Sequence, residues 1–183
     1  MIIFICGGSK SGKSALGESF SKNLHKEGEL IYLATMKPTG EEDLKRIENH
    51  KKDREGTNFL VFEVLEDIEK AEEFIKETDT VLLDSITSLL ANEMFKEKII
   101  FNSEEKIIKG VKALSKKAKN LVIVSDYIFN DSIVYDSITE SYRKSLGIIN
   151  CNIAKLSDVA IEASYSLMSI YKGEEILKNE RLI

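Results

Sequence analysis

The strand-loop-helix pattern at the N-terminus constrains this chain more than any other feature. Residues 7–14 complete the pattern G-x-x-x-x-G-K-[ST], and the apolar run Ile2–Cys6 before them predicts the buried strand that such a loop requires. Leu16, Phe20 and Leu24 follow at helical spacing. We therefore predict a phosphate-binding loop, and the matched context disfavours the alternative, a glycine-rich turn that binds nothing.

Each position of the loop has a physical role in this prediction. Gly7 and Gly12 allow backbone torsions and close approaches that a Cβ would block, so that successive N–H groups can converge on phosphate oxygens. Lys13 would place its charge at the β- and γ-phosphates, and the Ser14 hydroxyl would bind magnesium. The predicted phosphate-binding residues are Gly7, Gly8, Ser9, Lys10, Ser11, Gly12, Lys13 and Ser14.

The rest of the sequence alternates short apolar runs with helical patterns, which predicts a mostly parallel sheet in a three-layer α/β fold. The predicted strands are Ile2–Cys6, Leu30–Thr35, Phe59–Val64, Val81–Asp84 and Leu121–Ser125. The predicted helices are Ser14–Lys26, Glu41–Arg54, Asp67–Glu77, Ile86–Lys96, Ser103–Lys119 and Ser137–Leu156. Asn102 and Glu105 favour a capped start for the fifth of these helices.

The C-terminal part follows a different pattern. Val159–Ala163 and Leu167–Tyr171 are β-rich and only a few residues apart, which predicts an antiparallel hairpin at one edge of the sheet. A short tail that alternates polar and apolar residues follows from Glu174. Because 183 residues is the usual size of one domain, we expect residues 1–183 to form a single nucleotide-binding domain.

Charge and composition argue against several classes of protein. Lys and Arg total 26 against 31 Asp and Glu, and the net charge of -5 disfavours binding to nucleic acid. Cys6 and Cys151 lie far apart in apolar stretches, so we interpret them as buried thiols in a reducing cytosol. No apolar run is long enough to span a membrane, and we expect a cytoplasmic protein.

An acidic residue at the end of a predicted strand is a candidate partner for the phosphate loop. Thr80–Asp84 reads Thr-Val-Leu-Leu-Asp, and its final carboxylate could hold magnesium beside Ser14. An aspartate in this position often only starts the next turn. Paired with the phosphate loop, Asp84 becomes a candidate magnesium ligand together with Ser14.

The segment Glu41–Arg54 is strongly charged and has only two aliphatic residues. Arg46, His50 and Arg54 recur every four residues and would form one stripe on a helix. A basic stripe with a central imidazole can bind an anion, and histidine can both attack phosphorus and leave again. On spacing alone, the alternative of a solvated helix with internal ion pairs is favoured.

Taken together, these motifs resemble one enzyme family. The phosphate loop, the strand Tyr32–Thr35, the Arg46-Ile-x-x-His50-x-x-x-Arg54 helix, Glu63 and Leu83–Thr87 have the order and spacing of the bifunctional adenosylcobinamide kinase/adenosylcobinamide-phosphate guanylyltransferase family. This combination is more specific than any of its parts. It reverses the preference for a solvated helix, so that a functional role of His50 is favoured. The resemblance implies a RecA-like fold and a homotrimer.

The resemblance also implies an activity in cobalamin biosynthesis. Such an enzyme phosphorylates adenosylcobinamide from ATP or GTP, and His50 then attacks the α-phosphate of GTP, releases pyrophosphate and passes GMP to the corrinoid phosphate. Lys13 and Mg²⁺ would stabilise the departing charge. The nucleotide contacts implied beyond the phosphate loop are Ala34, Thr35, Met36, Lys51, Lys52, Asp53, Arg54, Glu63 and Asp84. Carboxylates at the last two positions suit the donor groups of guanine.

The resemblance becomes weaker after Leu121. The family usually has Asn-Glu-Val-Gly after the fifth strand, where this chain has Asp126-Tyr-Ile-Phe. Tyr127 and Phe129 could pack against a bulky ligand or belong to the core. Two other functions stay open from the residues themselves: a different small-molecule kinase in which His50 only binds phosphate, and a non-enzymatic nucleotide-binding subunit.

Overall fold

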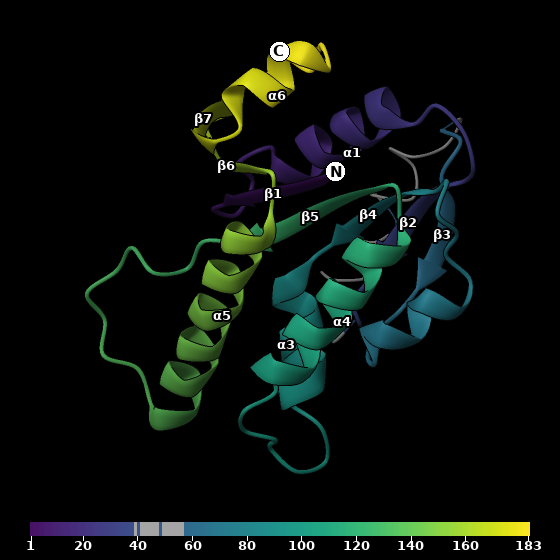
Figure 1. The fold of residues 1–183 in the computed structure, drawn as a ribbon. Helices are drawn as coiled ribbons and strands as arrows, with labels where there is room; N and C mark the ends of the chain where they lie inside the picture. Colours follow the sequence, from purple (N-terminus) through teal and green to yellow (C-terminus); the bar gives the residue numbers. More distant parts are fainter. Residues whose placement is uncertain (39, 41–47, 49–56) are drawn as a thin grey trace.

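The computed structural model describes residues 1–38, 40, 48 and 57–183. Its centre is a seven-stranded sheet in the order β3-β2-β4-β5-β1-β6-β7 (Figure 1). The strands are β1 Ile2–Gly7, β2 Leu30–Ala34, β3 Leu60–Glu63, β4 Thr80–Asp84, β5 Asn120–Asp126, β6 Val159–Ser164 and β7 Leu167–Lys172. All neighbouring strands pair in parallel except β6 and β7, which form the antiparallel hairpin predicted for the sheet edge.

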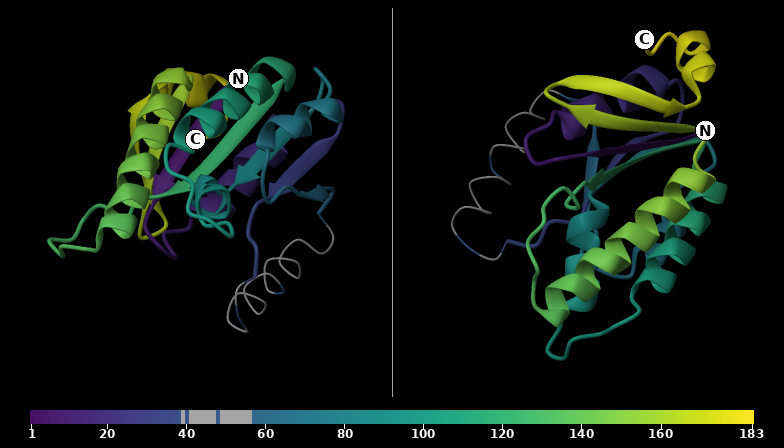
Figure 2. Two further views of the ribbon diagram at one scale, coloured as in Figure 1. Left: turned by 90° about the horizontal axis from the view of Figure 1, so that it is seen from below. Right: turned by 90° about the vertical axis from the view of Figure 1, so that its left-hand side faces the viewer.

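Strand register brings the important loops to one edge of the sheet. Gly7 at the end of β1 is level with Asp126 on β5 and with Ala163 on β6. Ala34 at the end of β2 is level with Asp84 on β4 and Glu63 on β3. The right-hand view of Figure 2 shows this carboxyl edge at the end of the sheet opposite the N-terminus. Parallel strands therefore gather residues that are more than a hundred positions apart in the sequence.

Helices cover both faces of the sheet and make three layers. The helix α1, Lys13–Leu24, packs on one face beside the C-terminal α6, Glu174–Asn179, while α3, Ile86–Met94, α4, Glu104–Lys117, and α5, Ser137–Leu156, pack on the other (Figure 1). A hydrophobic core lies on each face of the sheet. Successive strand residues alternate between these two cores, because side chains along a strand point to opposite faces. In β1, Phe4 joins the core under α3, α4 and α5, whereas Ile3 and Ile5 face α1. The three-layer α/β fold predicted from the sequence is confirmed.

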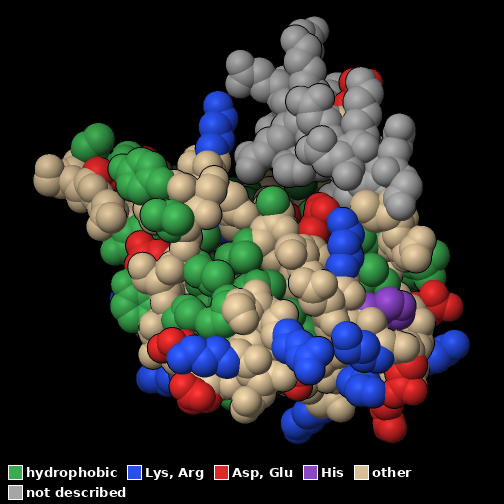
Figure 3. Space-filling model, turned by 90° about the horizontal axis from the view of Figure 1, so that it is seen from above, with side chains coloured by type: hydrophobic (Ala, Val, Ile, Leu, Met, Phe, Trp, Pro, Cys, Tyr) green, Lys and Arg blue, Asp and Glu red, His purple; other side chains and the backbone are tan. Residues whose placement is uncertain are grey.

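On the face that carries α1, hydrophobic side chains also remain at the surface. Figure 3 shows them gathered on the half of this face that carries the hairpin, with basic side chains nearer the other half. Leu167 and Tyr171 of β7 are exposed by 75% and 73%. No helix in the described part of the chain is long and apolar enough to cross a membrane.

The structure differs from one predicted helix and forms another that was not predicted. The segment predicted as the helix Asp67–Glu77 is a short 3-10 helix, η1, Ile68–Glu73, because Asp67 takes a left-handed conformation with φ 53° and donates its N–H to Glu93. The tail from Glu174 forms α6 and buries Leu177 in the core beside β6. The helix predicted over 41–54 lies outside the described residues, apart from residue 48.

Two predictions about single side chains were also wrong. Ser103, not Asn102, precedes α4, and its side chain does not cap the helix, while Asn102 has a positive φ of 63°. Cys151 is exposed, because it lies on α5 on the side opposite Ile149 and Ile153, which point into the core. Cys6 is partly buried, and this burial, with Asp126 nearby, raises the pKa of its thiol to about 12.

Candidate active site

The phosphate loop connects β1 to α1 at the carboxyl edge of the sheet. Gly12 has φ 91° and is the last residue before the helix, where its carbonyl accepts the N–H of Leu16 at 2.9 Å. That left-handed torsion favours glycine. Gly7 is needed for a different reason, since a Cβ there would lie 2.4 Å from the carbonyl oxygen of Ala163. Both glycines therefore fix the course of the loop against its neighbours.

The Lys13 side chain is almost fully buried beneath this loop. Its Nζ lies 2.7 Å from Asp126 Oδ1 and donates to the Gly8 carbonyl at 3.2 Å. A buried ammonium needs such partners, because the loss of hydration is otherwise too costly. Asp126 and the Gly8 carbonyl thus hold the charge of Lys13 against the loop.

Asp126 is the site residue that the sequence predictions missed. It ends β5, directly beside β1, and its backbone N–H donates to Thr87 Oγ1 at 2.8 Å. The next residue, Tyr127, donates its N–H to the Gly7 carbonyl at 2.9 Å. An acidic residue at the carboxyl end of a buried strand was the signal used for Asp84, and the same signal could have found Asp126.

Asp84 ends β4, the strand on the other side of β5. Its Oδ2 accepts a hydrogen bond of 2.8 Å from the Tyr32 hydroxyl. This bond orients the carboxylate and leaves its other oxygen available for a ligand. In the described residues no group of three or more His, Cys, Asp or Glu side chains could enclose a metal ion. The oxygen donors Ser14 and Asp84 do suit Mg²⁺, which is usually held by one or two protein ligands together with phosphates and water.

Thr35 ties β2 to the turn after β4. Its hydroxyl donates to the Ser85 carbonyl at 2.7 Å and accepts the Ser85 N–H at 2.8 Å, and Asn92 donates to the Thr35 carbonyl at 2.7 Å. The peptide bond between Asp84 and Ser85 is cis. The Thr35 side chain is fully buried in these bonds, whereas its neighbours Ala34 and Met36 are half-buried.

The two carboxylates expected at guanine are brought toward the same side of the phosphate loop. Glu63 is exposed at the end of the edge strand β3, and Ala34 lies between it and Asp84 in register. The predicted nucleophile His50 and its neighbours Lys51, Lys52, Asp53 and Arg54 lie outside the described residues. The chain leaves β2 toward these residues at the same edge of the sheet.

A polar network from α5 holds the end of β5 in place. Asn150 of α5 accepts a hydrogen bond from the Ser125 hydroxyl at 2.7 Å and donates to the Asp126 carbonyl at 3.3 Å. The position of Asp126 is therefore set by α5 as well as by the sheet.

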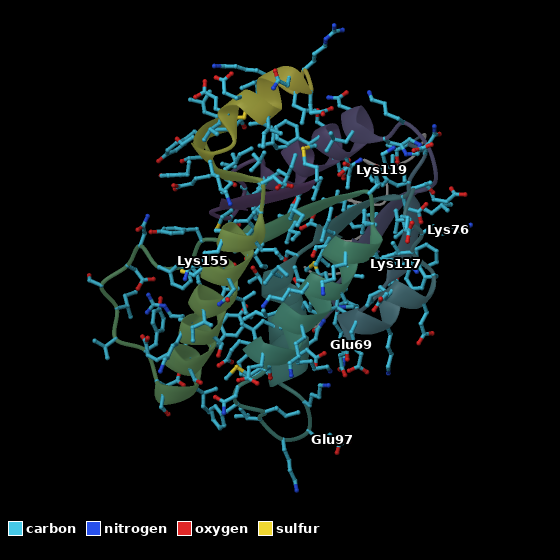
Figure 4. All side chains as sticks on the ribbon, viewed as in Figure 1. Glu69, Lys76, Glu97, Lys117, Lys119 and Lys155 are labelled. Atoms are coloured by element: carbon cyan, nitrogen blue, oxygen red, sulfur yellow. The ribbon has the colours of Figure 1, made fainter. Side chains whose placement is uncertain are left out.

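Elsewhere, exposed charges of both signs, such as Lys76, Glu97 and Lys155, project from the surface (Figure 4).

Comparisons with known proteins agree with this geometry. A family model described as cobinamide kinase / cobinamide phosphate guanyltransferase matches residues 3–165. The chain belongs to this family. No curated protein matches the sequence.

Solved structures show the wider fold. The ATPase domain of G40P has a TM-score of 0.50 and 15% identity, with 88% of this chain and 68% of that chain covered. The flagellar accessory protein FlaH from Methanocaldococcus jannaschii has a TM-score of 0.43 and 16% identity, with 93% and 77% covered. The first of these likenesses supports a phosphate-loop ATPase fold and nothing narrower.

Two features at the end of β5 and in the loop after it bear on the site. Asp126 forms the ion pair with Lys13. In the next loop, Phe129 packs against the core and lies under Gly147, whereas Tyr127 is 38% exposed and meets the Phe129 ring edge-on at 5.5 Å. Phe129 therefore has the core role, and only Tyr127 is free to face a ligand.

Proposed function

We propose that this protein phosphorylates adenosylcobinamide and then transfers GMP from GTP to the product through a guanylyl-histidine at position 50. The observation that carries the proposal is the complete phosphate loop with Lys13 buried beneath it, in a chain that belongs to the cobinamide kinase / cobinamide phosphate guanyltransferase family. Members of that family are the bifunctional enzyme.

In the kinase step, the loop N–H groups and Lys13 would bind the β- and γ-phosphates of ATP or GTP. The corrinoid hydroxyl oxygen bonds to the γ-phosphorus, the bond from that phosphorus to the bridging oxygen breaks, and the nucleoside diphosphate leaves. The hydroxyl proton passes to water. Lys13 favours this step because its charge lies where negative charge develops on the leaving group.

In the transferase step, an imidazole nitrogen of His50 bonds to the α-phosphorus of GTP and pyrophosphate leaves. The oxygen of the corrinoid phosphate then bonds to the same phosphorus, and the phosphorus–nitrogen bond breaks, which returns the imidazole. Glu63 and Asp84 would accept hydrogen bonds from guanine N1–H and its amine, groups that adenine lacks at that edge. The chain thereby replaces one encounter between two anions with two displacements.

Oxygen ligands suit magnesium, and Ser14 and Asp84 are the residues that would hold it. Because the Tyr32 hydroxyl occupies one Asp84 oxygen, Asp84 would serve either the metal or the guanine base, and not both at once. When bound, the metal would supply charge neutralisation to the phosphates. Lys51, Lys52, Asp53 and Arg54 follow His50 in the sequence and are proposed to contact the same nucleotide. The basic members of this group suit phosphate oxygens.

A homotrimer is part of the same proposal. Exposed apolar side chains such as Phe101, Ile133 and Val134 offer surface that an assembly would bury. Sedimentation equilibrium tests this directly, since a mass of three chains supports the trimer and a mass of one chain contradicts it.

A pulse-chase experiment tests the proposed sequence of reactions. The protein is incubated with magnesium and α-labelled GTP, freed of nucleotide, and then mixed with cobinamide phosphate. We expect the protein-bound label to move into GDP-cobinamide. Label that stays on the protein, or product that forms only when fresh GTP is added, would contradict a covalent intermediate.

A further inference from the structure

An open groove lies beside the phosphate loop, between the first turn of α1 and the β6–β7 hairpin. It has a volume of about 540 Å³, and its lining includes Gly12, Ala15, Leu16, Ala163, Leu167 and Met168. The hairpin is fastened to the loop by a hydrogen bond of 3.1 Å from the Ser166 N–H to the Ser11 carbonyl. The groove is thus continuous with the loop that is expected to bind phosphates, and it is large enough for a purine and a ribose.

The direction of Lys13 indicates which end of a nucleotide would enter this groove. Lys13 points to the β5 side of the loop, where it meets Asp126, and the groove opens on the β6 side. In a phosphate loop the lysine contacts the terminal phosphates of a triphosphate. A nucleotide with its γ-phosphate at Lys13 can therefore extend its ribose and base away from β5 and into the groove.

The carboxylates proposed to recognise guanine lie in the other direction. The sheet order places β4 and β3 on the β5 side of the loop, and β3, which carries Glu63, is four strands away from β1. With strands about 4.8 Å apart, this separation is roughly 19 Å. A base seated in the groove cannot reach Glu63, so the two positions require two poses of the nucleotide.

The groove also has the chemistry of an unselective base site. Its side-chain lining holds aliphatic groups, methionine and serine hydroxyls, but no carboxylate, amide or cation that would read the edge of a base. Ser11, which is 7% exposed, lines the groove, and its buried hydroxyl has no hydrogen-bond partner in the described part of the chain. Such a hydroxyl gains a partner when a phosphate or ribose oxygen binds next to it.

We propose that this groove seats the base and ribose of the purine triphosphate that donates phosphate in the kinase step, while GTP in the transferase step directs its base toward Glu63 and Asp84. This inference rests on the proposed function. One phosphate loop would serve both reactions with the nucleotide in opposite directions. The kinase pose would accept adenine and guanine alike, and the transferase pose would select guanine.

The substitution Leu167→Asp tests the two poses separately. It introduces a carboxylate into the apolar wall of the groove, and Tyr165→Asp is the matched control, because it adds the same charge to the same hairpin at a 93% exposed position outside the groove. For Leu167→Asp we expect about tenfold weaker binding of the Mg²⁺ complex of adenosine 5′-(β,γ-imido)triphosphate by calorimetry. The protein-bound label formed from α-labelled GTP should change less than twofold, and Tyr165→Asp should change neither quantity.

Other results would overturn the inference. Equal losses of ATP-analogue binding and GTP-derived label in Leu167→Asp would mean a single pose, and unchanged analogue binding would place the base elsewhere. A change in the sedimentation mass of Leu167→Asp with unchanged analogue affinity would identify the groove as a contact between subunits. If the unsubstituted protein forms no label from α-labelled GTP, the proposed function fails, while the calorimetric comparison still decides whether the groove holds the ATP analogue.

Photolabelling with 8-azido-ATP locates the base without any substitution. After trypsin digestion, we expect the label on the peptides 14–22 and 156–172, which contain the two walls of the groove. An excess of unlabelled ATP should prevent this labelling. Label on the peptide that ends at Lys70 and contains Glu63 would contradict the inference.

Discussion

The Lys13 ammonium lies 2.7 Å from the Asp126 carboxylate, across the two strands that meet beneath the phosphate loop. A bound triphosphate would take over Lys13 as its own partner, and it would leave the Asp126 carboxylate close to phosphate charge. We therefore expect the ion pair to stabilise the protein without nucleotide and to oppose nucleotide binding.

Asp126→Asn should bind GTP with magnesium about fivefold more tightly than the unsubstituted protein. The substitution removes the repulsion between the Asp126 carboxylate and the phosphates, which is about 1 kcal/mol. Its free energy of unfolding without nucleotide should fall by about 1 to 3 kcal/mol, since buried Lys13 loses a charged partner. Calorimetry and denaturant unfolding measure the two effects. Asp131→Asn removes an exposed carboxylate from the following loop and is the control. Weaker GTP binding by Asp126→Asn would instead make Asp126 a ligand of the nucleotide-bound metal.

Lys13→Ala should lose both phosphorylation of cobinamide and guanylyl transfer, because each step needs charge stabilisation at the leaving phosphates. We expect a loss of at least about 100-fold in kcat/KM for each reaction. Lys22→Ala, at the other end of α1, should retain both activities. Retention of either activity by a folded Lys13→Ala protein would show that the two reactions do not share the loop.

Gly7→Ala should disturb the phosphate loop, whereas Gly8→Ala should not. A Cβ at Gly7 would lie 2.4 Å from the Ala163 carbonyl oxygen and 2.6 Å from Ser11 Oγ, but a Cβ at Gly8 meets no atom within 4 Å. The first substitution should lower the free energy of unfolding by about 1 to 3 kcal/mol and weaken GTP binding. Thermal unfolding with and without GTP measures both. Equal stability of the two variants would mean that the Ala163 carbonyl does not approach Gly7 this closely.

Lys106 joins Asp67 to Glu93, whose side chain is almost fully buried. Hydrogen bonds from Lys106 and Lys70 hold the pKa of Asp67 at about 2, and although burial opposes it, Lys106 also lowers the pKa of Glu93. Lys106→Met should lower the free energy of unfolding by about 2 to 3 kcal/mol near neutral pH, because Glu93 then keeps only Lys96 and the Asp67 N–H as partners among the described residues. Lys109→Met, on an exposed position of the same helix, is the control.

The same substitution predicts a pH dependence. A carboxyl group whose pKa is lower in the folded state contributes stability above its unfolded pKa, near 4, and this contribution is lost as the pH falls toward the folded value. The stability difference between the unsubstituted protein and Lys106→Met should therefore be constant between about pH 5 and pH 9 and shrink between about pH 4 and pH 2. A difference that is unchanged at pH 2.5 would mean that packing, and not charge, accounts for it.

The sequence was sufficient to predict the layers, the parallel strands and the edge hairpin. Runs such as Leu30–Thr35 and Leu121–Ser125 consist mostly of apolar residues, and this composition predicts buried strands. Three parts depended on long-range contacts that local patterns do not encode. Asp67 breaks the expected helix because it bonds to Glu93 and Lys106, and α6 forms where Leu177 finds the core. Asp126 carries the local signal of an acidic residue at a strand end, but its pairing with Lys13 depends on the register that places it level with Gly7 and on its contact with Asn150.

His50 is proposed to carry GMP, and the chain's two histidines allow a matched test of this role. His50→Asn and His25→Asn are each incubated with magnesium and α-labelled GTP, and the protein-bound label is measured after treatment with acid and with base. We predict that His25→Asn and the unsubstituted protein hold an acid-labile, base-stable label, that His50→Asn holds none, and that γ-labelled GTP labels none of the three. Label of the same stability on a folded His50→Asn protein would contradict a guanylyl-histidine at position 50.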